Sequence, residues 1–186
     1  ESRKSVFAHT FSAKSMKGVA KPNDSDGKKI STIVDKNRDN INTLIFLFGT
    51  VDLVFSYIYV KLIRKEKFQF KQIAKSFVEF VNGLDVDNKK KIIFAAFPNP
   101  ASDKGYMKRI INSYKIPNLT QKEIQSYFGF KCREERRKKF NGYLQEYCKL
   151  YKINYINVDK ELFNKDQSNI LEKYIVPDDY NIHLLW

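Results

Sequence analysis

Three short apolar runs separated by long helical patterns restrict the fold of this chain more than any other feature. The runs cover residues 43–48, 91–97 and 153–158, and a Gly, Pro or Asp residue follows each one. Short apolar runs without strict alternation are typical of strands buried on both faces of a parallel sheet. Strands that alternate with long helices predict right-handed crossovers and a three-layer α/β/α sandwich, in which a ligand binds beyond the carboxyl ends of the strands.

The helical patterns lie between these runs. The polar, turn-rich stretch 21–29 indicates a surface loop before a helix that covers about 28–39. Two apolar stripes at helical spacing mark further helices, and we interpret both stripes as core. The second of these helices is expected to open with Glu134 and Glu135, because acidic residues favour helix N-termini. The stripes consist of Phe70, Ile73, Phe77, Phe80 and Val81, and of Phe140, Tyr143, Leu144, Tyr147, Cys148 and Tyr151.

The length and charge of the chain limit its organisation and its partners. We expect a single domain over residues 1–186, since this length gives one domain with a sizeable core. The sequence starts at Glu1 without an initiator Met, which indicates a processed chain or a piece of a longer protein. Lys and Arg outnumber Asp and Glu by 34 to 21, and the net charge of +13 favours anionic partners such as nucleic acid, acidic glycans or phosphorylated substrates.

Several classes of site and location are disfavoured by what the sequence lacks. Cys132 and Cys148 belong to no Cys-x-x-Cys or Cys/His cluster, so we expect no metal site and a cytoplasmic or other reducing compartment. Cys148 falls on an apolar stripe, which predicts a buried, inert thiol. No apolar run approaches the roughly 20 residues that span a bilayer, so no membrane association is expected. The sequence also contains no Walker loop and no Gly-x-Gly-x-x-Gly motif.

Polar and glycine residues after the strands suggest a hydrolytic site. Gly49 follows the first apolar run, where its amide is a candidate oxyanion donor or simply part of a turn. Asp52 is a candidate helix cap. At the other end of the sequence, Asp179 and His183 form a carboxylate and imidazole pair, which is half of a hydrolytic triad. The alternative interpretation is that these two are ordinary surface residues.

Four segments together resemble the SGNH/GDSL hydrolase superfamily, and more closely a subgroup that includes sequences from large DNA viruses. They are residues 9–18, 48–52, 98–100 and 178–186, and they occur in the same order as the motifs of the family. The resemblance implies a flavodoxin-like α/β/α sandwich. For active members it also implies ester or acetyl hydrolysis without a cofactor.

The resemblance assigns roles to individual residues, beginning with the nucleophile and the oxyanion donors. Glu1-Ser2 stands where the family has the end of its Gly-Asp-Ser motif, so Ser2 is the candidate nucleophile, and a terminal residue without a role is the alternative. Ala13 occupies the place of the family's second-motif Gly, where a backbone amide is retained. Val51 replaces the Asn of a Gly-x-Asn-Asp motif, so one side-chain oxyanion donor is missing.

The terminal motif of the family is Asp-x-x-His, and here the corresponding pair is one residue longer. His183 is the candidate general base, and either Asp179 or Asp178 orients its imidazole. His9, the other histidine, is expected to be structural or on the surface. An active enzyme with these parts would hydrolyse an acylated and acidic substrate, such as a glycan, with no metal or organic cofactor.

Two further functions stay open at the level of sequence. The first is a noncatalytic SGNH-like module that binds glycan or nucleic acid and has lost activity with the change at Val51 and the incomplete first motif at Glu1-Ser2. The second is a basic nucleic-acid-binding α/β domain in which tyrosines stack on bases and lysines contact phosphates. No aromatic RNA motif or recognition helix in the sequence supports the second function.

Overall fold

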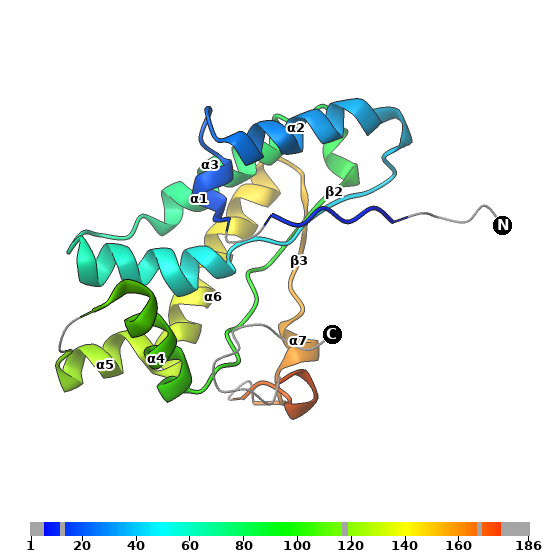
Figure 1. Ribbon diagram of the computed structural model, residues 1–186. Helices are drawn as coiled ribbons and strands as arrows, with labels where there is room; N and C mark the ends of the chain where they lie inside the picture. Colours follow the sequence, from blue (N-terminus) through cyan, green and yellow to red (C-terminus); the bar gives the residue numbers. More distant parts are fainter. Residues whose placement is uncertain (1–5, 12–13, 117–118, 167–168, 176–186) are drawn as a thin grey trace.

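The computed structural model describes residues 6–11, 14–116, 119–166 and 169–175. Within them, three parallel strands combine with seven α-helices (Figure 1). The strands are β1 (Leu44–Phe46), β2 (Lys91–Phe94) and β3 (Asn154–Ile156). The helices are α1 (Met16–Val19), α2 (Ser25–Asn37), α3 (Phe70–Asn82), α4 (Asp103–Tyr114), α5 (Gln121–Phe128), α6 (Phe130–Leu150) and α7 (Asp159–Leu162).

The parallel sheet predicted from the apolar runs is confirmed. Its order is β1-β2-β3, and its register pairs Phe46 with Ile93 and Ile93 with Tyr155. Each strand lies within one predicted run, and helices fill the connections, as parallel pairing requires. The carboxyl ends of the three strands therefore lie along one edge of the sheet.

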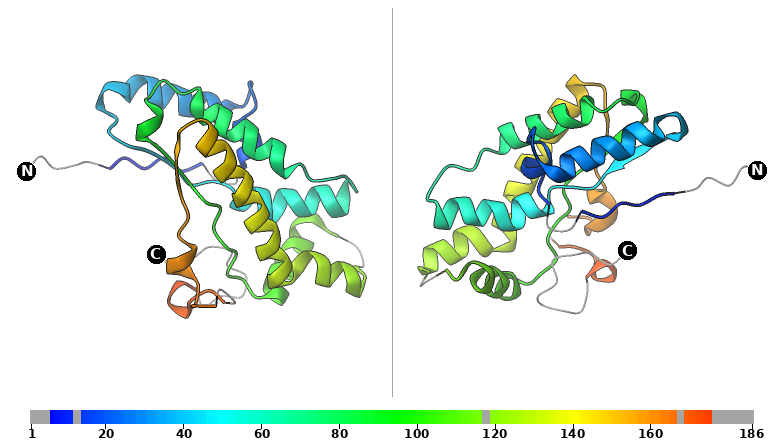
Figure 2. Two further views of the ribbon diagram at one scale, coloured as in Figure 1. Left: turned by 180° about the vertical axis from the view of Figure 1, so that it is seen from behind. Right: turned by 45° about the horizontal axis from the view of Figure 1, so that its top comes forward.

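One face of the sheet carries the main core. Phe46 and Ile93 pack against α3 and α6, which lie together on that side of the sheet (Figures 1 and 2). The two predicted stripes supply the helix side of this core, and Cys148 is buried within it as expected. Burial also raises the pKa of the Cys148 thiol to about 12, which keeps it protonated and inert.

The opposite face of the sheet differs from the expectation of a three-layer sandwich. The side chains of Ile45 and Leu47 are 52% and 59% exposed. A strand buried on both faces would hide such residues. The structure is thus mixed α/β with a small parallel sheet, and a third layer is not confirmed in the part of the chain that it describes.

Local signals explain where several helices begin. Asp24 accepts hydrogen bonds from the amides of Asp26 and Gly27, so α2 starts a few residues before the expected position. Thr120 and Glu123 form a capping box at the start of α5. The expected start of α6 at Glu134 is wrong, since this helix already begins at Phe130, after Gly129. Glu134 is buried inside the helix and pairs with an arginine instead.

Candidate functional site

Asp52 is a buried carboxylate just beyond the carboxyl end of β1. Its Oδ2 accepts a hydrogen bond of 2.7 Å from the Met16 amide, and its Oδ1 accepts one of 3.3 Å from the Lys17 amide. Asp52 therefore does not serve as the helix cap considered from its position in the sequence. It fastens the segment around α1 to the turn that follows β1, and so joins two of the four segments that resemble the SGNH motifs.

Burial controls the protonation of this carboxyl group. It raises the pKa of Asp52 to about 6, while hydrogen bonds from the Met16 and Lys17 amides act in the opposite direction. No cation forms an ion pair with Asp52 among the described residues. The negative charge is stabilised by backbone N–H groups rather than by a basic side chain.

The helix that contains Asp52 has unusual geometry. It widens to π-helical turns over Asp52–Ser56 and again over Tyr59–Ile63. Such turns are rare and occur frequently at functional sites. The sequence predicted a helix here only through the candidate cap Asp52, because the chain from residue 50 to 63 is apolar on most sides and has no amphipathic pattern.

Gly49 adopts a conformation that other residues rarely take. Its φ angle is 111°, and a Cβ added to it would lie 2.7 Å from the Cβ of Ala96 and 3.3 Å from the Cε of Met16. The glycine therefore allows β1, β2 and α1 to approach one another closely. Its expected role as an oxyanion donor stays a prediction.

The end of β2 is held by the side chain of Asn141 on α6. Its Oδ1 accepts from the Ala96 amide at 2.9 Å, and its Nδ2 donates to the Ala96 carbonyl at 3.0 Å. This pair of bonds completes the backbone hydrogen bonding of a residue that lies past the last strand pair. It also fixes α6 against the carboxyl edge of the sheet.

A buried ion-pair network surrounds Arg137 at the same edge. Its guanidinium contacts both carboxylate oxygens of Glu134, and it forms two further hydrogen bonds to Asp159, the shorter at 2.7 Å. It also donates to the Ala96 carbonyl at 3.3 Å. One arginine thus connects α6, the end of β2 and the start of α7.

The loop after β2 is held by a second arginine. Arg133 donates to the carbonyls of Asn99 and Ala101 at 3.0 and 2.8 Å, and it pairs with Asp103 at 2.8 Å. Asn99 is buried, and its Oδ1 accepts from the Ala101 amide at 3.0 Å. The Pro98-Asn-Pro100 segment is thereby hydrogen-bonded to α6 at the edge where the sequence predicts a ligand.

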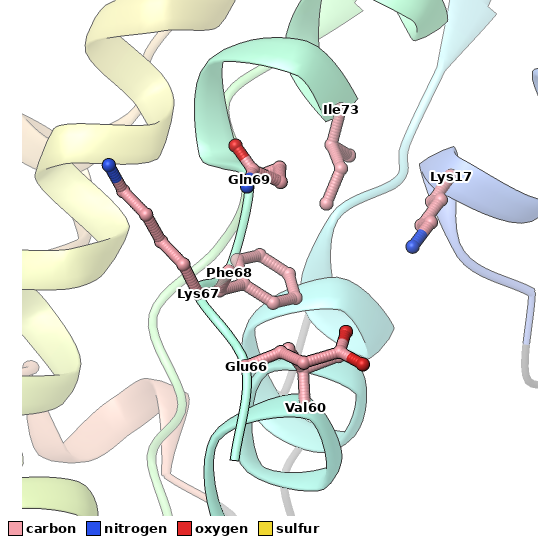
Figure 3. Close-up of a pocket in the computed structure, with 7 residues that line it drawn as sticks. All are labelled: Lys17, Val60, Glu66, Lys67, Phe68, Gln69 and Ile73. Atoms are coloured by element: carbon pink, nitrogen blue, oxygen red, sulfur yellow. The ribbon is translucent and has the colours of Figure 1, made fainter. Parts of the chain in front are cut away.

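A hollow lies beside Lys17, close to this edge of the sheet. It has a volume of about 320 Å³, and Phe68, Ile73 and Val60 supply its apolar surface. Figure 3 shows the Lys17 ammonium and the Glu66 carboxylate facing one another from opposite sides, while Lys67 points away from both. The amide of Lys17 is one of the two that bind Asp52, so the hollow adjoins the fastened segment.

Most candidate catalytic residues lie outside the described part of the chain. Ser2, Ala13, Asp179 and His183 belong to this group, as does Asp178, the alternative partner of the histidine. Their roles stay predictions. Val51 is half-buried at the start of the helix that contains Asp52, and its side chain has no donor for an oxyanion. His9 is on the surface, which is one of the two alternatives expected from the sequence.

Sequence reasoning missed the buried arginines of α6. Arg133, Arg136 and Arg137 are between 2% and 7% exposed. They continue the apolar stripe backwards from Phe140 at intervals of three and four residues, which is the signal that could have identified them. A charged residue on the extension of a buried stripe indicates a side chain that is paired inside the protein.

The described residues contain no group of three or more His, Cys, Asp or Glu side chains that could hold a metal ion. None of their helices is long and apolar enough to cross a membrane. Cys132 and Cys148 are both free thiols. Comparisons with protein-family models, curated proteins and solved structures found no significant match to the chain.

Proposed function

We propose that the chain is an SGNH-like serine ester hydrolase. The observation that carries this proposal is the hydrogen bonding of Asp52 to Met16 and Lys17, which holds the second motif-like segment against the turn that contains Gly49. These are the two segments that would supply the backbone amides of an oxyanion hole. A fixed pair of such amides is the part of an acyl-transfer site that lowers the barrier most.

In the proposed reaction, the Oγ of Ser2 attacks an ester carbonyl while His183 takes its proton. Asp179 or Asp178 holds the imidazole in the tautomer that accepts this proton. Amides near Ala13 and Gly49 stabilise the oxyanion. His183 then donates the proton to the leaving alcohol, and water hydrolyses the acyl-enzyme by the same route in reverse. The proposed reaction uses neither a metal nor an organic cofactor.

The parallel sheet and its exposed face support the corresponding fold. An order of three parallel strands brings their carboxyl ends together at one edge, where open α/β sheets bind ligands. We extend the proposal to a three-layer, flavodoxin-like sandwich. A third layer over β1 would bury Ile45 and Leu47, which are now the exposed apolar side chains of this face.

We propose an acylated, acidic substrate, with a glycan as the first class to test. The hollow beside Lys17 is within the range of roughly 300–1,000 Å³ that small-molecule sites occupy. Its apolar wall would accept an acyl group, and the Lys17 ammonium would attract a carboxylate or sulfate. The net charge of +13 would raise the rate at which an anionic substrate is encountered.

Val51 favours a second candidate function, which is a noncatalytic binding module. Where the family pattern has a side-chain donor, this position offers only an aliphatic group. Loss of one oxyanion donor costs on the order of 100-fold to 1,000-fold in rate. A domain that tolerates this loss would bind an acidic glycan or nucleic acid without hydrolysing it.

The two functions are separated by labelling the natural full-length chain with a fluorophosphonate and mapping the modified peptide. The hydrolase proposal expects modification of Ser2 that is lost in Ser2→Ala and in His183→Ala. His9→Ala is the matched control, because it removes the other histidine from an exposed position and is expected to label normally. Folding of each variant is checked by circular dichroism.

If folded protein gains no label at any serine, the hydrolase proposal is wrong. The binding module is then tested with acidic glycans and single-stranded nucleic acid. Nucleic-acid binding through phosphate contacts would make the logarithm of the affinity fall linearly with the logarithm of the salt concentration. Glycan binding that depends on Lys17 would instead be lost in Lys17→Gln and kept in Lys36→Gln, an exposed lysine on α2.

A further inference from the structure

Three buried donors lie around a second, much smaller cavity and have no hydrogen-bond acceptor among the described residues. They are Nδ2 of Asn99, Nε of Arg133 and Nη1 of Arg136. The three residues are 6%, 5% and 7% exposed. A buried N–H group without an acceptor is unfavourable, and more so when it is charged, so three at one place require an explanation.

Two acceptors in the walls of the cavity already have donors of their own. Leu53, Val54 and Phe97 form its apolar side. The Val54 carbonyl already accepts from the Tyr106 hydroxyl at 2.8 Å. Both oxygens of Glu134 are bonded to Arg137. The buried side-chain atoms of the lining that have no partner are therefore all donors.

The residues that line the cavity include three arginines and one carboxylate, Glu134, and the arginines differ in their ion pairs. Arg137 is compensated by Glu134 and Asp159, and Arg133 pairs with Asp103. Arg136 instead donates to the Tyr127 carbonyl at 2.8 Å and stacks on the Tyr57 ring, with 4.5 Å between its Cζ and the ring centre. It has no ion pair with a described carboxylate. An uncompensated buried cation is unfavourable unless an anion accompanies it.

We infer that this cavity binds a single halide-sized anion, held by Asn99, Arg133 and Arg136. Its volume of about 10 Å³ matches one solvent-sized particle and excludes phosphate or a carboxylate group. A water molecule would accept some of the three hydrogen bonds but would itself need acceptors. A chloride ion accepts all three and balances the charge of Arg136. The inference does not depend on whether the chain is a hydrolase.

The test is thermal unfolding in sodium chloride and in sodium gluconate at equal ionic strength. Equal ionic strength cancels general screening of the +13 charge, and gluconate is too large for the cavity. Chloride is expected to raise Tm along a saturating curve. A tenfold excess over Kd corresponds to about 3–6 °C for a protein of this size. An identical Tm in the two salts would overturn the inference.

Asn99→Asp is the variant that tests the anion site most directly. It retains the acceptor for the Ala101 amide and places a fixed negative charge beside the two arginines. It is expected to lose the chloride response and to be at least as stable in gluconate as the wild type. Asn40→Asp changes the net charge equally at an exposed position and should respond to chloride like the wild type. A full chloride response in Asn99→Asp would contradict the proposal.

A second measurement uses the wild-type protein and therefore tests the inference even if Asn99→Asp does not fold. Crystals of the wild-type protein grown in sodium bromide are expected to show an anomalous peak between Asn99, Arg133 and Arg136. Bromide resembles chloride in charge and size and identifies the ion directly. Absence of a peak in this cavity would overturn the inference.

Discussion

Buried polar side chains at the two ends of the sheet differ in whether their N–H groups have hydrogen-bond acceptors. At the amino end, Lys91 is completely buried, and its three N–H groups are taken by three acceptors at 2.8–3.0 Å. These acceptors are the Asn82 carbonyl, the Leu84 carbonyl and the Asn88 side chain. At the carboxyl end, donors of Asn99, Arg133 and Arg136 have no acceptor in the described part of the chain. Lys91 is thus satisfied by the protein itself, whereas the three donors at the carboxyl end are the ones that the proposed anion would satisfy.

Lys91 and Asp52 are the two most similar groups in this comparison, one at each end of the sheet. Each is a buried charged group that only neutral groups contact through hydrogen bonds. Burial lowers the pKa of Lys91 and raises the pKa of Asp52 to about 6, so both are shifted towards the neutral form. The pKa of Asp52 therefore lies close to physiological pH, so we expect the charge at the carboxyl end of the sheet to change with pH in this range.

The largest expected effect comes from removing the centre of the ion-pair network at the carboxyl end. Arg137→Met leaves Glu134 buried without its cation, and we expect a loss of about 3–5 kcal/mol in the free energy of unfolding. Urea denaturation measures this change. Arg38→Met breaks the exposed pair with Asp85 and should cost at most about 1 kcal/mol. Equal losses in the two variants would show that the network does not organise this end.

The next largest expected effect is the contribution of Asp52 to the pH dependence of the free energy of unfolding. Its pKa in the folded protein, about 6, lies above the ordinary value of 3.8. The folded state therefore binds this proton more tightly, and the resulting stabilisation is full below about pH 4 and lost as the pH rises to 6. Two pKa units correspond to about 3 kcal/mol.

Asp52→Asn should remove this part of the pH dependence between pH 4 and 6. Urea unfolding at a series of pH values measures it, and Asp39→Asn, an exposed carboxylate, serves as the control. The same slope in the wild type and in Asp52→Asn would show that burial does not control this group.

Lys91→Met tests the amino end by itself. It leaves three acceptors without their donor, and we expect a loss of about 2 kcal/mol in the free energy of unfolding. Because this end has no proposed ligand, the chloride response of the variant should match that of the wild type. A lost response would remove the distinction between the two ends.

The last comparison concerns the effect on stability of replacing two glycines that have different surroundings. Gly49→Ala places a Cβ 2.7 Å from Ala96 at a φ of 111°, and it should cost about 1–3 kcal/mol. Gly142→Ala adds a methyl group on α6 with no described atom within 4 Å, and it should stabilise the protein by about 0.5–1 kcal/mol. The two shifts in Tm should therefore have opposite signs. An unchanged or raised Tm in Gly49→Ala would show that Gly49 is not required for close packing.

Much of the fold followed from the sequence because apolar periodicity reports burial. The runs that became β1, β2 and β3, and the stripes of α3 and α6, were all identified in this way. The same reasoning overestimated burial on the second face, since an apolar strand does not show what covers it. Ile45 and Leu47 illustrate this limit.

The candidate site could be predicted only in part. The position of Gly49 after β1 was identified, but the hydrogen bonds of Asp52 join residues 35 and 36 positions apart, and no local pattern reports them. Buried arginines are missed for a related reason. Their charge suggests solvent exposure, whereas Arg137 is buried because partners from other elements neutralise it.

The most direct test of the central claim is the rate of fluorophosphonate labelling at Ser2 in Asp52→Asn and in Lys91→Met, compared with the wild type at equal folded fraction. Release of the segment around Met16 should displace the oxyanion amides, so Asp52→Asn is expected to label up to about 100-fold more slowly. Lys91→Met should label at the wild-type rate. Equal rates in the two variants, or no label in any of the three proteins, would contradict the assignment of catalysis to the carboxyl end of the sheet.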